Sequence, residues 1–537
     1  MYMKYEYVDL KGSSTQYEDY EKGRPVEARY IPAKIEADKG NPFVEALSLP
    51  RTEEEVLCDY NTILPSYSYD KTSSMSKLDK MLSVGLLKSI RFPLPFHNQL
   101  EFSFYNALLT SYRARKPLFS DNNSIPYYYE NQKCESKGVL LGDAAESTNA
   151  GFSLVGYSGC GKSSAIKILV SHYPQVIIHH FGEYGAFPQI TYLVVNCIPN
   201  SNFGALYESI GDAIDKAMGN IEPVYALEIN KARNLGAKAE KVRALVERFA
   251  VGIIIFDEIQ LINFEHTKEN TFDSLLTLAN RTKTAIAVVG TEDAKEKMFG
   301  ELRTARRLGT VINGNNYCKS RKFFDILAGD LFRYQWFDQP ISYTKEIGDT
   351  LFDLTKGIID QLISIYSAVQ IEYLHSTKKP VVDGEYFRKV ARKYYSGIQD
   401  VLANLENTEN ASKLNEIRLI GAQMQNTVID EERQKAQAEK IIEAQQERAQ
   451  NNIDLYNITN RIKGLFDDFS DEQIQEAYKK VIAKKTSQGK SEKEIARLVI
   501  EKLQSTPKKK PVKGSKIAKM DTGEMRSFLG LDKKEEQ

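Results

Sequence analysis

The chain has 537 residues, several times the length of an average domain, so more than one folded unit is expected. Hydrophobic residues make up 42% and charged residues 27%, as in globular proteins. Lys and Arg number 72, as do Asp and Glu, so the zero net charge gives no indication of nucleic acid binding. No apolar run approaches the roughly 20 residues that span a bilayer, and the five scattered cysteines lack metal-ligand spacing. A secreted, membrane or zinc-binding protein is therefore excluded, and a cytoplasmic one is expected.

Composition divides the chain into five regions. The first is rich in tyrosine and proline without a long periodic segment, which predicts an extended or partly ordered N-terminal arm. A helical pattern over 100–112 follows and ends in cations before Pro117. The predicted regions are the arm (1–95), an α/β core (96–340), a helical lid (341–404), a long polar helix with a small helical unit (405–505), and a flexible lysine-rich tail (506–537).

Short apolar runs alternate with helical patterns between residues 151 and 295, which is typical of a parallel sheet with crossover helices. The runs are rich in β-branched residues and almost uninterrupted, as expected for strands covered on both faces. The predicted strands are 152–155, 191–195, 251–256 and 285–289, and helices are expected at 203–218 and 238–249. Beyond residue 345 the pattern is helical, and it includes a long polar helix over 399–450 and a helical unit over 453–504.

A phosphate-binding loop is the strongest motif. The segment GYSGCGKS matches GxxxxGK[ST], and it lies between a predicted strand and an amphipathic helix, as phosphate binding requires. Lys162 is expected to reach the β- and γ-phosphates of ATP, and the Ser163 hydroxyl to ligate Mg²⁺. The alternative is a glycine-rich turn without a ligand. The predicted ATP-binding residues are Gly156, Tyr157, Ser158, Gly159, Cys160, Gly161, Lys162, Ser163 and Ser164.

Two carboxylates end the apolar strand 251–256, at the sheet edge where open α/β sheets bind ligands. Asp257 is expected to hold Mg²⁺, and Glu258 to deprotonate the attacking water, which predicts an ATPase. Thr291 follows strand 285–289 and can sense the γ-phosphate. Asn196 can hold Glu258 in an inactive rotamer, although a plain loop amide is an equal alternative.

A basic cluster follows in the segment ELRTARRLG. If subunits pack side by side, Arg306 or Arg307 can reach a neighbour's γ-phosphate and neutralise transition-state charge. The alternative for each arginine is a solvated helix face.

These motifs, followed by helices, resemble the AAA+ superfamily. Within it the chain resembles the TnsC family, ATP-dependent regulators of heteromeric DNA transposons, and its shorter TniB relatives. The resemblance rests on GNPFVEAL, YRARKP, IIIFDEIQ and GTEDA…RTARRLG, and it covers roughly residues 38–400. It implies an AAA+ core with a helical lid, Thr291 as sensor 1, and Arg306 or Arg307 as a finger that acts in trans. One departure is Asp360, an acid where many AAA+ lids carry an arginine.

A member of this family would assemble with ATP on double-stranded DNA as a ring or a helical filament, and ATP hydrolysis would disassemble it. The resemblance implies a target-selection protein of the TniQ type at the N-terminal region, transposase subunits at the C-terminal tail, and a location at the bacterial nucleoid.

DNA contacts must come from a local patch. The segment 228–243 is rich in cations around Gly236, which suits phosphate contacts that are largely blind to sequence. The candidate DNA-binding residues are Ser201, Asn202, Lys231, Arg233 and Lys238; an exposed face with snorkelling lysines is an equal alternative. Two other functions stay open: a replication initiator or helicase loader, and a scaffold that binds ATP without turnover.

Overall fold

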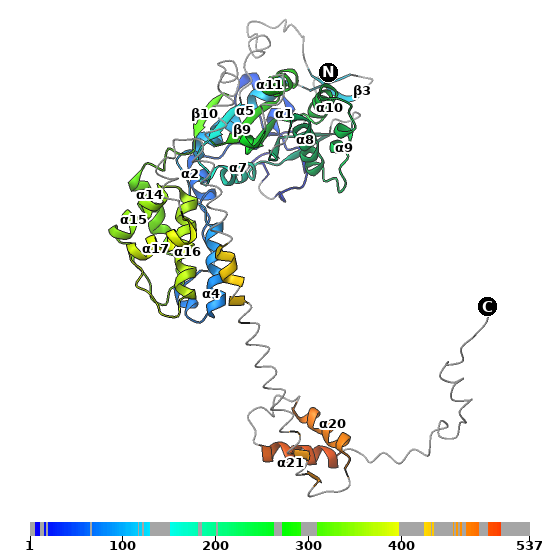
Figure 1. The fold of residues 1–537 in the computed structure, drawn as a ribbon. Helices are drawn as coiled ribbons and strands as arrows, with labels where there is room; N and C mark the ends of the chain where they lie inside the picture. Colours follow the sequence, from blue (N-terminus) through cyan, green and yellow to red (C-terminus); the bar gives the residue numbers. More distant parts are fainter. Residues whose placement is uncertain are drawn as a thin grey trace, which may run out of the picture. The chain divides into compact units, whose positions relative to one another are not determined.

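The computed structural model describes residues 6–10, 16–17, 20–64, 67–115, 117–120, 123–128, 151–180, 185–199, 202–262, 271–291, 309–396, 424–430, 469–482 and 492–505, with isolated residues between 432 and 463. The chain forms two compact units, residues 1–431 and 432–537, each described separately below (Figure 1).

A parallel five-stranded sheet forms the centre of the first unit. Its order is β10-β4-β9-β8-β7, and every neighbouring pair runs parallel. The strands are β4 (Phe152–Val155), β7 (Tyr192–Asn196), β8 (Ile253–Asp257), β9 (Ala285–Gly290) and β10 (Thr310–Asn313). This confirms the predicted α/β fold with a parallel sheet. Because β9 lies between β4 and β8, its end is placed between the phosphate loop and the Asp257–Glu258 pair.

Four of these strands were predicted within two residues, but β10 was not. Its four residues lie at the edge of the sheet, and only Ile312 is buried. An edge strand of this kind lacks the continuous apolar run by which the other strands are recognised.

Helices cover both faces of the sheet. Side chains alternate along β8, so that Ile253 and Ile255 lie in one core cluster while Ile254 and Phe256 lie in the other. The first cluster includes α5 (His97–Arg113) and α7 (Lys162–Val170). The second includes α8 (Phe203–Ala217), α10 (Leu235–Arg248) and α11 (Thr271–Thr282), with α9 (Tyr225–Asn230) packed on α8.

The described part of the N-terminal region is more ordered than the sequence predicts. Buried side chains such as Phe43, Tyr60 and Met81 belong to the main core cluster rather than to an extended arm. Their spacing is hard to recognise in the sequence because each element is short. The elements are η1 (Glu36–Asp38), α1 (Pro42–Glu45), α2 (Glu53–Asp59), α3 (Tyr69–Thr72), α4 (Lys77–Val84) and η2 (Gly85–Ser89).

Two smaller sheets complete the strands of this unit. In the first, β1 (Val26–Glu27) pairs with β5 (Val176–His180), which pairs with β6 (Ala186–Ile190). The N-terminal region is thereby joined to the segment after α7. The second sheet is the hairpin β2 (Pro117–Ser120) and β3 (Asn123–Tyr128).

Four helices follow β10 and are called the lid below, α14 (Arg321–Leu331), α15 (Lys345–Thr355), α16 (Ile359–His375) and α17 (Gly384–Tyr394). The predicted lid, over 341–404, contains three of them, and α14 precedes it. The N-terminal helix α4 packs against α16, and both are drawn beside each other in Figure 1. The Tyr67 hydroxyl donates to the Gln335 carbonyl at 2.7 Å, which adds a polar contact between the N-terminal region and the lid.

The second unit contains α20 (Asp471–Ile482) and α21 (Glu492–Gln504), which pack together around Ile474 and Val499. Most of the polar helix predicted over 399–450, and the whole lysine-rich tail, lie outside the described residues. Among the described helices none is both long and apolar enough to cross a bilayer.

Candidate nucleotide-binding site

The loop between β4 and α7 has the backbone shape that glycine allows. Gly159 and Gly161 have φ values of +85° and +98°, a region that side chains with a Cβ rarely adopt. A Cβ added to Gly156 would lie 2.8 Å from both the Asn315 side-chain oxygen and the Cys160 sulfur. Gly161 directly precedes α7, so the loop leads into a helix N-terminus, where backbone N–H groups face outward to bind an anion.

Lys162 lies across this loop. Its ammonium donates to the carbonyls of Gly156 at 2.8 Å and Tyr157 at 2.9 Å, and the side chain is buried. These two carbonyls hold a positive charge inside the loop. Phosphate oxygens are stronger acceptors than neutral carbonyls, so the same ammonium can exchange them for a nucleotide's phosphates.

Asp257 and Ser163 meet at the end of β8. Asp257 is 6% exposed, and this burial raises the pKa of its carboxyl, whereas a hydrogen bond from the Ser163 hydroxyl acts in the opposite direction. A carboxylate and a hydroxyl in contact, next to a phosphate loop, fit Mg²⁺, which usually takes one or two protein ligands together with phosphate oxygens and waters. Among the described residues no group of three or more His, Cys, Asp or Glu side chains is arranged to hold a metal ion.

Glu258 has an unusual backbone. Its φ of 57° and ψ of 42° lie in the left-handed region, and the short helix η4 (Ile259–Leu261) begins directly after it. The Glu258 N–H donates to the Asp257 carboxylate at 2.9 Å, which stabilises this turn. The strand therefore ends abruptly, and the chain folds back beside the sheet edge.

Gln260 is the residue that the sequence interpretation missed. Its amide nitrogen donates to the Glu258 carboxylate, and its amide oxygen accepts from the Thr291 N–H at 3.2 Å. The sequence holds a signal, because Gln260 closes the IIIFDEIQ segment two residues after Glu258. Asn196, for which a contact with Glu258 and a plain loop amide were equal alternatives, is exposed at the end of β7. Among the described residues the Glu258 carboxylate accepts from Gln260.

Thr291 lies at the end of β9, between the phosphate loop and Glu258. Its hydroxyl is buried and has no hydrogen-bond partner among the described residues. A buried hydroxyl without a partner is unfavourable by about 1–3 kcal/mol, which is expected where a ligand completes the bonding.

The lid touches the phosphate loop. The Asp360 N–H, at the start of α16, donates to the Gly159 carbonyl at 3.2 Å, and a Cβ added to Gly159 would lie 3.3 Å from an Asp360 carboxylate oxygen. An acid thus lies beside the loop that binds phosphate, where many AAA+ lids carry an arginine. The connection from β10 to α14 adds two contacts: Asn315 accepts from the Tyr157 N–H at 2.6 Å, and the Tyr317 hydroxyl donates to the Cys160 carbonyl at 3.2 Å.

The structure gives the candidate DNA-binding residues different partners. Asn202 caps α8 by accepting from the Ala205 N–H at 3.0 Å, and Lys238 forms an ion pair with Glu208. Lys231 and Arg233 are exposed in the turn between α9 and α10, with no ion pair among the described residues. Ser201, Arg306 and Arg307 lie outside the described residues, so their roles stay predictions.

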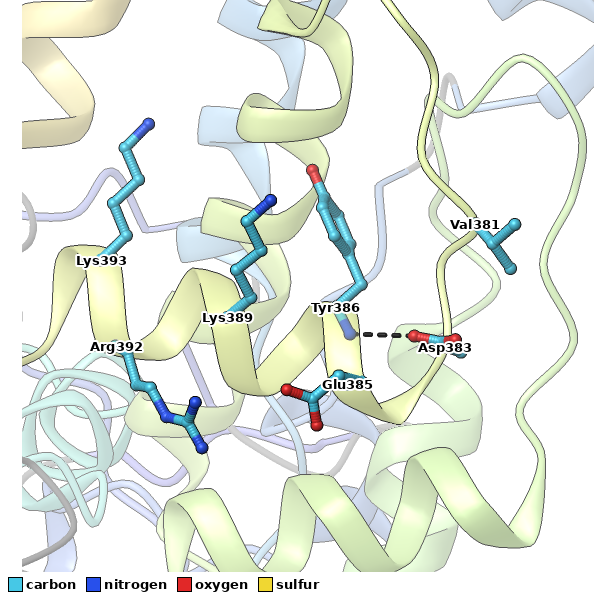
Figure 2. A pocket seen from close by; sticks show the side chains of 7 residues that line it. All are labelled: Val381, Asp383, Glu385, Tyr386, Lys389, Arg392 and Lys393. Carbon is cyan, nitrogen blue, oxygen red and sulfur yellow. Dashed lines mark hydrogen bonds between the residues drawn. The ribbon is translucent and has the colours of Figure 1, made fainter.

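A hollow of about 590 Å³ lies elsewhere, on lid helix α17. Figure 2 shows Tyr386, Lys389 and Lys393 extending to one side of the helix and Arg392 to the other. Two carboxylates, Asp383 and Glu385, also line it, and Lys393 already pairs with Glu372 at 2.7 Å. This open surface of mixed charge lacks the glycine loop, so the β4–α7 loop remains the candidate nucleotide site.

Comparison with known proteins agrees with this geometry. Residues 145–298, which contain the phosphate loop, Glu258 and Thr291, match the family model described as AAA domain. The protein is an ATPase. The matched segment covers less than half of the chain, and no curated protein matches the sequence.

Two solved structures have a limited similarity to this chain. The ORC1 protein of Aeropyrum pernix, in complex with DNA, is 12% identical with a TM-score of 0.33, over 46% of this chain and 59% of its own. The Walker-type ATPase of Pyrococcus abyssi is 13% identical with a TM-score of 0.30, over 48% of this chain and 70% of its own. Likeness at this level does not identify a function.

Proposed function

We propose that this ATPase is a regulator of DNA transposition that assembles with ATP on double-stranded DNA, connects a target-selection protein to a transposase, and disassembles when ATP is hydrolysed. The proposal begins from the resemblance to the TnsC family, which rests on four separate sequence segments.

The single observation that best supports the proposal is that these segments meet in pairs. Asn41, in GNPFVEAL, donates to the Tyr112 carbonyl, in YRARKP, at 2.8 Å. Gln260, in IIIFDEIQ, accepts from the N–H of Thr291, in the GT segment, at 3.2 Å. Segments that share contacts constrain one another, so their joint occurrence is stronger support than four independent short matches.

The residue roles follow from the geometry of the β4–α7 loop. Lys162 and the loop N–H groups would bind the phosphates, and Ser163 and Asp257 would hold Mg²⁺, which supplies charge neutralisation at the phosphates when bound. Glu258 would deprotonate the attacking water, and the Thr291 hydroxyl would donate to the γ-phosphate or to that water.

Assembly would couple ATP to DNA. Arg306 or Arg307 would reach the nucleotide of a neighbouring subunit, so that the γ-phosphate becomes part of the contact between subunits and its loss weakens that contact. Lys231 and Arg233 are exposed without an ion pair in the described part of the chain, and they would contact DNA phosphates.

A replication initiator is the alternative within the same superfamily. Such a protein would be expected to carry a winged-helix domain after the lid. The elements described between residues 424 and 505 are helices, α20 and α21 among them, which favours the regulator.

The test is assembly. Purified protein, a slowly hydrolysed ATP analogue and duplex DNA are expected to give rings or filaments around the duplex in electron micrographs, and Lys162→Ala is expected to give none. Lys167→Ala, in the same helix but outside the loop, is the matched control and should assemble as wild type does. Monomers both with and without the ATP analogue, or normal assembly by Lys162→Ala, would contradict the proposal.

A further inference from the structure

Gln260 connects two parts of the catalytic site that come from different strands. Glu258 follows β8 and Thr291 follows β9, and these strands are neighbours in the sheet. One end of the Gln260 amide donates to the Glu258 carboxylate, and the other accepts from the Thr291 N–H. An amide suits this task because it carries a donor and an acceptor on one rigid group.

The backbone of Glu258 makes this contact possible. A left-handed residue after a strand reverses the chain, and η4 then brings residue 260 back beside residue 258. For a residue other than glycine this conformation costs about 1–2 kcal/mol. The Leu261 N–H donates to the Glu258 carbonyl at 3.0 Å, so the turn is closed by its own hydrogen bond.

We propose that Gln260 is a positioning residue for ATP hydrolysis: its amide fixes the direction of the Glu258 carboxylate relative to the end of β9. The carboxylate of a glutamate is attached through three rotatable bonds and has several rotamers, and in only some can it accept a proton from an attacking water. The bond from Gln260 selects one of them. The hydrogen bond from the Thr291 N–H fixes Gln260 to the end of β9, where the buried Thr291 hydroxyl also lies. The Glu258 carboxylate and the Thr291 hydroxyl therefore keep a fixed position relative to each other.

The first experiment measures the hydrolysis step itself with Gln260→Ala in the full chain. Single-turnover hydrolysis, with enzyme in excess over ATP, separates this step from product release. Removal of the amide is expected to lower the rate constant about tenfold while the affinity for ATP changes less than twofold. Lost affinity with an unchanged rate constant would mean a role in binding instead, and it would overturn the proposal.

The second experiment uses Gln260→Glu, which keeps the shape of the side chain. A carboxylate at this position can still accept from the Thr291 N–H, but it cannot donate to Glu258 and it brings a like charge beside it. Because this carboxylate cannot donate, the single-turnover rate constant of Gln260→Glu is expected to fall as it does in Gln260→Ala, although the size and shape of the side chain are kept. A purely structural role would be preserved by a side chain of the same shape.

The control is Gln175→Ala together with Gln175→Glu. Gln175 is also half-buried, and its amide donates to the Tyr192 carbonyl at 3.3 Å, away from Glu258. Both control variants should match wild type in rate constant. If Gln260→Ala or Gln260→Glu stays within twofold of the wild-type rate constant, the proposal is wrong.

Discussion

The side-chain amide of Asn41 donates to the main-chain carbonyl of Tyr112 at 2.8 Å, and its oxygen accepts from the Phe43 N–H at 3.1 Å. One side chain thus caps α1 and ties it to the end of α5, the helix that packs on the central sheet. Two further contacts strengthen this junction, because Arg113 pairs with both oxygens of Asp38 at 2.6 and 2.8 Å. The N-terminal region is therefore bound to the ATPase core by specific polar contacts.

Asn41→Ala is expected to destabilise this junction. It removes a helix cap and one of the two hydrogen bonds to the Tyr112 carbonyl, which still accepts from the Arg115 N–H at 3.0 Å. Together these losses lower the free energy of unfolding by about 1–3 kcal/mol. Urea unfolding measures the change. Asn61→Ala, at an exposed position, is the control and should stay within about 0.5 kcal/mol of wild type. Equal stabilities for both variants would show that the junction contributes nothing.

Glu258→Gln is expected to abolish turnover while ATP still binds. The amide keeps the size of the side chain but cannot accept a proton, so hydrolysis should fall by a factor of about 100 or more. Assemblies on DNA should then persist after the point at which wild-type assemblies dissociate. Glu385→Gln, on the exposed face of α17, is the control. Substantial hydrolysis by Glu258→Gln would mean that another group is the base.

The double variant Lys231→Ala and Arg233→Ala is expected to weaken DNA binding. Each lost phosphate contact reduces the slope of log affinity against log salt by about one. Fluorescence anisotropy at several salt concentrations measures both quantities. The matched control is Lys389→Ala with Arg392→Ala, an exposed lysine and arginine on the lid. If the control variant weakens DNA binding and the Lys231→Ala, Arg233→Ala variant does not, the DNA-binding surface lies on the lid instead.

Asp360→Asn is expected to raise the affinity for ATP. The carboxylate lies beside Gly159, and its negative charge opposes the phosphates, whereas an amide keeps the shape and the main-chain bond from residue 360. A severalfold fall in the dissociation constant for ATP is expected, and it should shrink at high salt. Asp212→Asn, exposed on α8, is the control. Weaker ATP binding by Asp360→Asn would mean that this carboxylate assists nucleotide binding.

Acid is expected to destabilise the first unit through His179. The ring is buried between the Tyr30 hydroxyl at 2.8 Å and the Gln189 side-chain oxygen at 2.7 Å, and burial lowers its pKa to about 4. The unfolded chain, with an ordinary pKa near 6.5, binds the proton more tightly. The contribution of this neutral histidine is therefore complete above pH 6.5 and is lost as the pH falls toward 4, by about 3 kcal/mol in all.

Urea unfolding between pH 7.5 and 4 tests this expectation. His179→Gln should lose less stability over that interval than wild type does, although it starts from a lower value. His180→Gln changes an exposed neighbour whose charge contributes less than burial to the lowered pKa of His179, so most of the wild-type pH dependence should remain. Burial also lowers the pKa of His97, to about 3, so His97 destabilises the fold in acid in the same way. The wild-type protein should therefore lose more free energy of unfolding than one histidine accounts for.

The sequence alone determined the features that are local in the chain. A strand, a glycine loop and a helix follow one another within about twenty residues, and each pattern is dictated by the periodicity or backbone freedom that its own residues require. For the same reason four of the five central strands and the helices α5, α8 and α10 were predicted close to their observed bounds. The edge strand β10 and the short helices of the N-terminal region were missed, because they are too brief to show a period.

Only the tertiary structure decided which of these features meet. Gln260 and Thr291 lie 31 residues apart in the chain, and Asn41 and Tyr112 lie 71 apart. The strand order is what brings β9 beside β8 and the lid residue Asp360 against Gly159, and many strand orders are compatible with the same succession of elements. Contacts between distant residues depend on how the whole core is packed, and no local pattern records that packing.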